Sequence, residues 1–227
     1  LYLIPVTMGE SDPMDVLPQT VKRAIELIDC YIVENEKTAR KSIKAVLPEK
    51  KQSELVLFAL NKHTDAKEHL SFIQPLLEGK NVGLMSEAGC PGVADPGAVI
   101  VKLAHEKGIQ VIPLVGPSSI LLAMMASGMN GQSFTFNGYL PIDKSDKKSA
   151  LKNLEKLSFD KNQSQIFIET PYRNNKLLED ILQALQPSTH LCIATDITLP
   201  TEYIKTLRAS DWKKTKVDLH NRPTIFI

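Results

Sequence analysis

Apolar and amphipathic segments alternate along the first half of the chain. Short apolar runs predict strands, and apolar residues spaced three or four apart predict helices between them. The predicted strands are 1–6, 30–33, 55–60, 81–86 and 110–115, and the predicted helices lie within 16–28, 34–47, 65–77 and 98–107. This order is typical of a parallel sheet covered by helices. Because the strands are nearly continuous apolar runs, we expect both faces of this sheet to be buried.

The pattern changes in the second half of the chain, where strands separated by short turns become more frequent. After an apolar helix at 120–127, we expect strands at 133–139, 165–169, 190–195, 202–207 and 224–227, helices at 149–157 and 174–185, and a polar loop at 140–148. More strands with fewer helices indicate a mixed sheet. We therefore predict two α/β domains, residues 1–115 with the parallel sheet and residues 116–227 with the mixed sheet.

One loop stands out between the predicted strand 81–86 and the predicted helix 98–107. Its eleven residues, Glu87 to Gly97, include three glycines, two prolines and two carboxylates. Links of this kind usually have about two to six residues. Glycines allow the backbone to approach a ligand closely, and ligands of open α/β sheets bind at the carboxyl ends of strands. We interpret this segment as a ligand-binding loop; the alternative, an ordinary turn, does not account for its length.

Further polar segments follow other predicted strands. They cover residues 7–15, 116–119, 169–173 and 195–198, and with the glycine loop they are expected to line one cleft between the two sheets. Ser118 and Ser119 suit the start of the helix at 120–127, and their backbone N–H groups could also receive a carboxylate. Glu34 and Glu169 end strands, where a carboxylate serves either as a cap or as a general base or cation partner.

Charge, cysteine usage and absent motifs narrow the chemistry. A net charge of +1 gives no global attraction for nucleic acid, so an RNA ligand would need a local basic patch. The phosphate-binding glycine motifs are missing, which disfavours a dinucleotide or ATP. Three cysteines and five histidines show no metal-ligand spacing, so we expect no metal and a reducing, cytoplasmic location. No apolar stretch is long enough to span a bilayer, and we expect no membrane partner.

Two groups of basic residues are candidates for contacts with a phosphate backbone. The first comprises Lys144, Lys147, Lys148 and Lys152, and the second comprises Arg40, Lys41 and Lys44. Each group is equally consistent with a solvated surface or with phosphate contacts.

Four segments in the same order resemble the tetrapyrrole methylase family, in the branch that contains the small-subunit rRNA cytidine 2′-O-methyltransferase. Residues 86–97 (Ser-Glu-Ala-Gly-Cys-Pro-Gly-Val-Ala-Asp-Pro-Gly) are similar to the family's Ser-Asp-Ala-Gly-Thr-Pro-Gly-Ile-Ser-Asp-Pro-Gly. The other three matches are 113–119 (Pro-Leu-Val-Gly-Pro-Ser-Ser), 134–141 (Phe-Thr-Phe-Asn-Gly-Tyr-Leu-Pro) and 169–173 (Glu-Thr-Pro-Tyr-Arg). Together the matches span almost the whole chain.

Other loops depart from the family pattern. The loop at 6–13 keeps Gly9 and Asp12 of the family's Thr-Pro-Ile-Gly-Asn-Leu-x-Asp, and residues 195–199 lack both basic residues of its Arg-Glu-Leu-Thr-Lys. Residues 34–39 replace its Glu-Asp-Thr-Arg-x-Thr, and Tyr172 stands where the family has His. The glycine loop is thus retained, whereas the loops expected to face the acceptor have changed.

The resemblance implies a homodimeric methyltransferase that binds S-adenosylmethionine in a cleft between two α/β domains. Because this cofactor has no phosphate, missing phosphate motifs are expected. The cofactor-binding residues that the resemblance and the loops imply are Glu87, Ala88, Gly89, Gly92, Val93, Ser118, Ser119, Thr170, Tyr172 and Thr195.

The resemblance leaves the methyl acceptor open. It implies first a ribose 2′-hydroxyl of RNA, and then a tetrapyrrole carbon or another small molecule. A relative that binds the cofactor or RNA without turnover is a third alternative. Transfer would depend mainly on alignment of donor and acceptor. Glu34 and Asp196 are candidates for a base, and no catalytic residue is assigned.

Overall fold

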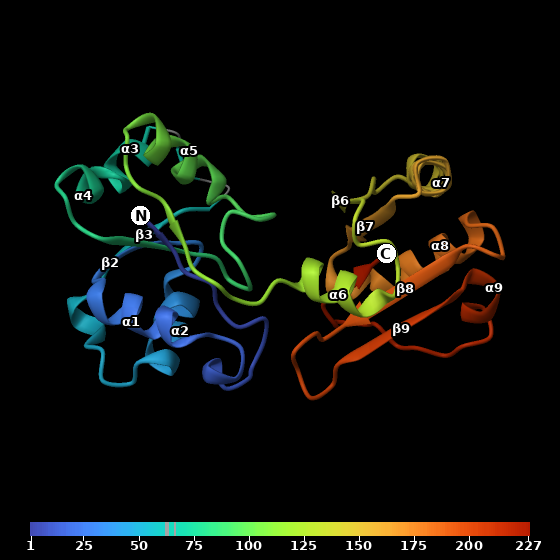
Figure 1. The fold of residues 1–227 in the computed structure, drawn as a ribbon, viewed down its shortest axis with the longest axis horizontal. Coiled ribbons are helices and arrows are strands. Elements are labelled where there is room, and N and C mark those ends of the chain that lie inside the picture. Colours follow the sequence, from blue (N-terminus) through green and yellow to red (C-terminus); the bar gives the residue numbers. More distant parts are fainter. Residues whose placement is uncertain (62–63, 66) are drawn as a thin grey trace. The chain divides into compact units, whose positions relative to one another are not determined.

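A computed structural model describes residues 1–61, 64–65 and 67–227 (Figure 1). The contacts divide the chain into two compact units, Leu1–Ser118 and Ser119–Ile227. Each unit is an α/β layer structure with its own five-stranded sheet, so the predicted fold class is confirmed. Within the described residues, no helix combines the length and the apolar character needed to cross a membrane.

The sheet of the first unit is parallel throughout, as predicted. Its strands are β1 (Tyr2–Leu3), β2 (Cys30–Val33), β3 (Val56–Ala59), β4 (Val82–Met85) and β5 (Ile112–Pro113). They lie in the order β3-β2-β4-β1-β5, and every neighbouring pair is parallel. Strand β1 and its neighbour at the sheet edge, β5, are shorter than expected. Pro5, after β1, lacks the backbone N–H that a longer ladder needs.

Helices cover both faces of this sheet (Figure 1). The helices are α1 (Gln19–Leu27), α2 (Glu36–Val46), α3 (His69–Phe72), α4 (Gln74–Leu77) and α5 (Ala98–Glu106). Successive strand residues point to opposite faces. Tyr31 and Met85 therefore pack with α1 and α2, whereas Ile32 and Leu84 pack with α3, α4 and α5.

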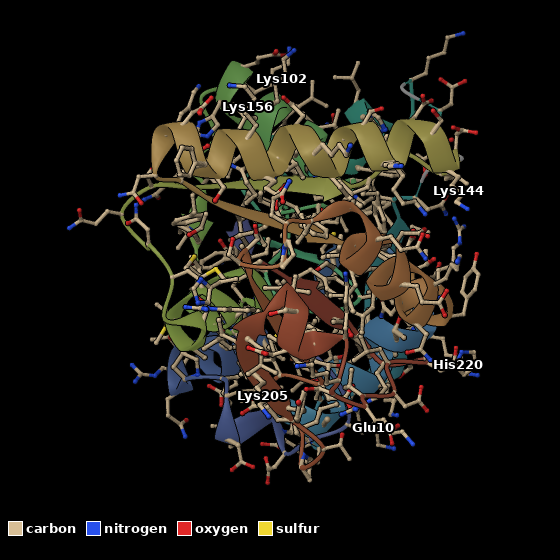
Figure 2. All side chains as sticks on the ribbon, turned by 90° about the vertical axis from the view of Figure 1, so that its right-hand side faces the viewer. Glu10, Lys102, Lys144, Lys156, Lys205 and His220 are labelled. Atoms are coloured by element: carbon tan, nitrogen blue, oxygen red, sulfur yellow. The ribbon has the colours of Figure 1, made fainter. Side chains whose placement is uncertain are left out.

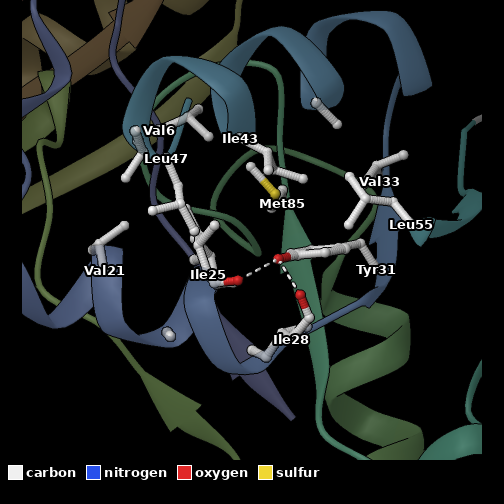
Figure 3. Packing of buried hydrophobic residues seen from close by; sticks show 14 of the residues in the cluster. Val6, Val21, Ile25, Ile28, Tyr31, Val33, Ile43, Leu47, Leu55 and Met85 are labelled. Carbon is white, nitrogen blue, oxygen red and sulfur yellow. Dashed lines mark hydrogen bonds between the residues drawn. The ribbon is translucent and has the colours of Figure 1, made fainter. Parts of the chain in front are cut away.

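The core between the sheet and the α1–α2 pair is centred on Tyr31 (Figure 3). This side chain is fully buried, and its hydroxyl donates a 2.7 Å hydrogen bond to the carbonyl oxygen of Ile28. A buried phenol needs such a partner. The bond ties the end of α1 to β2 and fixes where the following loops emerge.

The predicted helix at 65–77 is shorter and divided. It consists of α3 and α4, which meet at Ile73, and Pro75 in the first turn of α4 lacks the N–H that a continuous helix would use. Ala66, on which part of the expectation falls, lies outside the described residues.

The second unit has a mixed sheet, also as predicted. Its strands are β6 (Phe134–Tyr139), β7 (Ser164–Ile168), β8 (His190–Thr195), β9 (Tyr203–Arg208) and β10 (Thr224–Phe226), in the order β6-β7-β10-β8-β9. Only the β6–β7 pair is parallel. The helices are α6 (Ser119–Ser127), α7 (Lys144–Lys161), α8 (Asn174–Ala184) and α9 (Ala209–Trp212). Trp212 is buried in this core and donates to the carbonyl oxygen of Leu191.

The expected polar loop at 140–148 is wrong from Lys144 onward, because α7 begins at that residue. Asp143 caps the helix: its side chain accepts hydrogen bonds from the backbone N–H groups of Ser145 and Asp146. An acidic residue in the first turn adds to the stability of a helix N-terminus. The lysine-rich stretch is therefore the first turn of an 18-residue helix.

Candidate functional site

Loops of the first unit converge at the carboxyl end of the parallel sheet, beside β1 and β4. The chain leaves β1 toward β2 and leaves β4 toward β5, so the connections of these two neighbouring strands run in opposite directions. Such a switch point is where ligands bind in open α/β sheets. Residues 4–18 follow β1 and residues 86–97 follow β4, which places the predicted glycine loop at this point.

The glycine loop is closed on itself by Asp95. Its carboxylate accepts hydrogen bonds from the backbone N–H of Gly92 at 2.9 Å and of Gly97 at 2.7 Å. Ala94, between them, has a φ of 61°, in the left-handed region that non-glycine residues rarely adopt. The loop therefore has a defined conformation, in which Asp95 is a structural residue.

Glycines at this site have different roles. A Cβ on Gly116 would lie 2.3 Å from Pro5, so Gly116 is required for packing between neighbouring loops. Gly92 has a φ of +82°, and no atom lies within 4 Å of the position that its Cβ would take. Its backbone thus borders open space, as expected where a ligand approaches the main chain.

Direct contacts join the glycine loop to its neighbours. The N–H of Val6 donates to the carbonyl oxygen of Gly89 at 3.0 Å, and the thiol of Cys90 lies 3.3 Å from the carbonyl oxygen of Pro117. Burial raises the pKa of the Cys90 thiol, which favours its protonated, donating form. Residues after β1, β4 and β5 therefore form one connected rim.

Carboxylates lie at this rim. The N–H of Glu87 donates to Glu34 at 3.2 Å, and Thr38 donates to the Glu87 carboxylate at 3.2 Å. The pKa of Glu34 is raised, first by burial and then by the negative charges of Glu87 and Asp95. A carboxyl group with a raised pKa is better matched to proton transfer near neutral pH.

A pocket of about 620 Å³ opens next to the rim, within the first unit. Glu87 and Ala88 of the glycine loop form part of its wall, and the loop after β1 and helix α2 form most of the rest. Sequence reasoning missed this pocket. Its signal is the spacing of Thr38, Ser42 and Ala45 on α2, which places small side chains on one face of that helix.

The predicted site residues divide between the two units. Glu87, Ala88, Gly89, Gly92, Val93 and Ser118 lie in the first, and Ser119, Thr170, Tyr172 and Thr195 lie in the second. Ser119 is the first residue of α6. Thr170 hydrogen-bonds the carboxylate of Glu169 through its N–H at 2.7 Å and through its hydroxyl at 3.0 Å.

Tyr172 and Thr195 differ in what they offer a ligand. Tyr172 is exposed, and the guanidinium of Arg173 lies over its ring and donates to its hydroxyl. Thr195 is fully buried, and its hydroxyl is bonded to Pro223 and Thr224. Of these two residues, Tyr172 alone presents an exposed side chain.

Asp196, one of the two candidate bases, has a structural environment. Its carboxylate accepts hydrogen bonds from Arg222 at 2.7 Å and from Thr201 at 2.8 Å, and the residue is buried. The carboxylate is thus engaged by Arg222 and Thr201 inside the fold, where a substrate hydroxyl does not reach it. Of the two candidates, we therefore retain Glu34.

The basic groups differ from the sequence-based expectation. Lys147 is buried and forms an ion pair with Asp180 of α8 at 3.3 Å, so it is not part of a surface patch. Lys144, Lys148 and Lys152 are exposed and recur every four residues, so they share one face of α7. Figure 2 shows Lys144 and Lys156 on this helix.

The second basic group is largely engaged. Arg40 donates to the carbonyl oxygen of Gln52, and Lys41 pairs with Glu10 at 2.7 Å. These contacts make α7 the better candidate for a phosphate-binding surface.

Two α/β units, the first with a glycine loop at the switch point of its parallel sheet, agree with the class of S-adenosylmethionine-dependent methyltransferases that the sequence resembles. The model of the family "Tetrapyrrole (Corrin/Porphyrin) Methylases" matches residues 1–212. The chain belongs to this family and is an S-adenosylmethionine-dependent methyltransferase, which confirms the resemblance found in the sequence.

Individual proteins agree with the family assignment. The chain is 30% identical over 205 residues to "Ribosomal RNA small subunit methyltransferase I" of Escherichia coli O157:H7, covering 90% of this chain and 67% of the relative. It is 29% identical over 208 residues to the protein of the same name from Vibrio cholerae, with the same coverage. The solved structure of the methyltransferase CobJ has the same fold, with a TM-score of 0.65 at 16% identity over 99% of this chain and 91% of that one.

Proposed function

We propose that this methyltransferase acts on RNA of the small ribosomal subunit and transfers a methyl group to a ribose 2′-hydroxyl. The names of relatives at about 30% identity support the RNA acceptor. The main structural support for the cofactor site is the open space beside the backbone of Gly92. The rest of this loop is fixed by hydrogen bonds to Asp95.

The residues at the rim fit S-adenosylmethionine. The open backbone at Gly92 allows close approach, the Glu87 carboxylate can accept hydrogen bonds from ribose hydroxyls or pair with an ammonium group, and exposed Val93 offers apolar contact. The N–H groups at Ser118 and Ser119 can receive a carboxylate.

In this proposal the bound cofactor supplies an electrophilic methyl group. The protein aligns the acceptor hydroxyl with it, and this positioning contributes most of the acceleration. Glu34 receives the proton that the hydroxyl releases, and its raised pKa suits that role.

The second unit supplies the positive charge that RNA requires. Residues 119–227 contain fourteen Lys and Arg against eleven Asp and Glu, whereas residues 1–118 contain thirteen against fifteen. Lys144, Lys148 and Lys152 have no ion-pair partner within the described residues. We therefore place phosphate contacts on α7. We also propose that the enzyme is a homodimer in the cytoplasm.

Methyl transfer from labelled S-adenosylmethionine to small ribosomal subunits tests the function, with a uroporphyrinoid tetrapyrrole as the competing acceptor. We expect label in RNA and none in the tetrapyrrole. Label in the tetrapyrrole alone would contradict the RNA proposal while leaving the enzyme class intact.

RNA affinity at several salt concentrations tests the α7 surface. Replacing Lys144, Lys148 and Lys152 by Ala should reduce the salt slope by about 2, since each single-strand phosphate contact contributes roughly 0.7. The matched control replaces Lys213, Lys214 and Lys216, which carry the same charge on another segment. Equal losses in both triple variants would show a net-charge effect instead of a defined surface.

A further inference from the structure

The 620 Å³ pocket of the first unit has an apolar floor and a polar wall. Its floor is formed by Val6, Leu17, Ile25, Val46 and Met85, which all belong to the buried core of this unit. This volume lies within the range of pockets that enclose small organic ligands. It is large enough for a planar base.

The polar wall carries an excess of negative charge. Glu10, Asp12 and Glu87 line the pocket, and Lys41 is the only basic residue among the lining residues of the described chain. Lys41 is already paired with Glu10 at 2.7 Å. A phosphate or a polycarboxylate tetrapyrrole would meet like charge here, whereas a neutral group with N–H donors would find acceptors.

A second observation points to a ligand. The hydroxyl oxygen of Ser11, on the pocket wall, is buried and has no hydrogen-bond partner within the described structure. Buried polar atoms are nearly always paired, and leaving one unpaired costs free energy. A ligand with polar edges would supply the missing partner.

From these features we infer that the pocket binds the base of the methyl-accepting nucleotide, a neutral heterocycle that carries an exocyclic amine. This inference rests on the proposed RNA function and assigns its base-binding subsite. Carboxylates accept hydrogen bonds from the amino group of such a base, as they do from cytosine in duplexes. The apolar floor contacts the ring, and the phosphates stay outside the acidic wall.

The position of the pocket agrees with this assignment. Glu87 and Ala88 belong both to its wall and to the glycine loop. A base inside the pocket therefore leaves its ribose at the edge shared with that loop, near Glu34, which is bonded to the N–H of Glu87. Donor, acceptor hydroxyl and base would then be neighbours, as a direct transfer requires.

The main test fills the pocket with Ser42→Phe. The probe is methyl transfer to small ribosomal subunits, and S-adenosylmethionine affinity is measured in parallel by calorimetry. We expect the KM for subunits to rise at least tenfold with unchanged cofactor affinity. Lys37→Phe places the same side chain on an exposed part of α2 outside the pocket and should leave both values unchanged.

A second variant, Ser11→Ala, removes the unpaired hydroxyl without filling the pocket. It tests the inferred base-binding role of the pocket even if Ser42→Phe does not fold. We expect unchanged thermal stability and a KM for subunits raised roughly two- to tenfold, the effect of one hydrogen bond.

Unchanged KM values in both variants, or a parallel loss of cofactor affinity in Ser42→Phe, would overturn the inference. A parent protein that labels no RNA would instead overturn the proposed function, a result visible before any variant is compared.

Discussion

Gly92 provides a quantitative test of the cofactor site because Gly108 offers a matched control. Both glycines have positive φ, +82° and +68°, and no atom lies within 4 Å of a Cβ added to either. Gly108 follows α5, away from the rim loops. Replacing either by Ala places a side chain in the left-handed region, which costs about 1–2 kcal/mol. The two variants should therefore lose similar stability.

Their cofactor affinities should differ. In Gly92→Ala the new methyl group occupies space that the ligand needs, and we expect the Kd for S-adenosylmethionine to rise at least tenfold, about 1.4 kcal/mol. The Kd of Gly108→Ala for S-adenosylmethionine should equal that of the parent. Calorimetry gives the affinities and urea denaturation gives the stabilities. If Gly92→Ala binds the cofactor as tightly as Gly108→Ala does, the open space at Gly92 is not part of the cofactor site.

Two further predictions concern charged groups. Lys147→Ala should destabilise the protein by up to about 3 kcal/mol, because it leaves the buried Asp180 carboxylate with only the more distant Lys176 as a partner. The control Lys148→Ala should change stability by less than about 0.5 kcal/mol, and denaturation curves of the two variants make the comparison. In the parent, the acidic limb of the pH–rate profile should have an apparent pKa above the usual range for glutamate. Glu34→Gln should abolish this limb. The folded protein holds the Glu34 proton more tightly than the unfolded chain does, so the parent loses stability as the pH rises from 4.5 through the raised pKa of Glu34. Glu34→Gln does not ionise and should therefore be at least as stable as the parent at pH 7. Equal activity losses at every pH would count against Glu34 as a base.

Much of the fold was predictable because strand and helix periodicities are local signals. The strands Cys30–Val33 and His190–Thr195 were predicted with the bounds observed. The start of α7 was not, although Asp143 is a recognisable cap, because a run of lysines reads as a polar loop when its buried side is unknown. Lys147 lies on the same face as Leu151 and Leu154, and its partner Asp180 is 33 residues away.

The site was predictable only where a motif carries it. The glycine loop follows from its composition and from the family resemblance. The roles of its glycines required the structure, since only packing shows that Gly116 meets Pro5 while Gly92 meets nothing. Similarly, the ion pair that engages Asp196 comes from Arg222, 26 residues later in the chain. The pocket depends on how α2 packs beside the loop after β1, which no local pattern specifies.

The position of the transferred methyl group tests the central claim most directly. Small ribosomal subunits are incubated with the enzyme and labelled S-adenosylmethionine, and the RNA is then hydrolysed with alkali, which cannot cleave next to a 2′-O-methyl ribose. The account predicts that the label remains in an alkali-resistant dinucleotide with the methyl group on the ribose. Label found on a base, or no label in RNA from an enzyme that binds the cofactor, would contradict it.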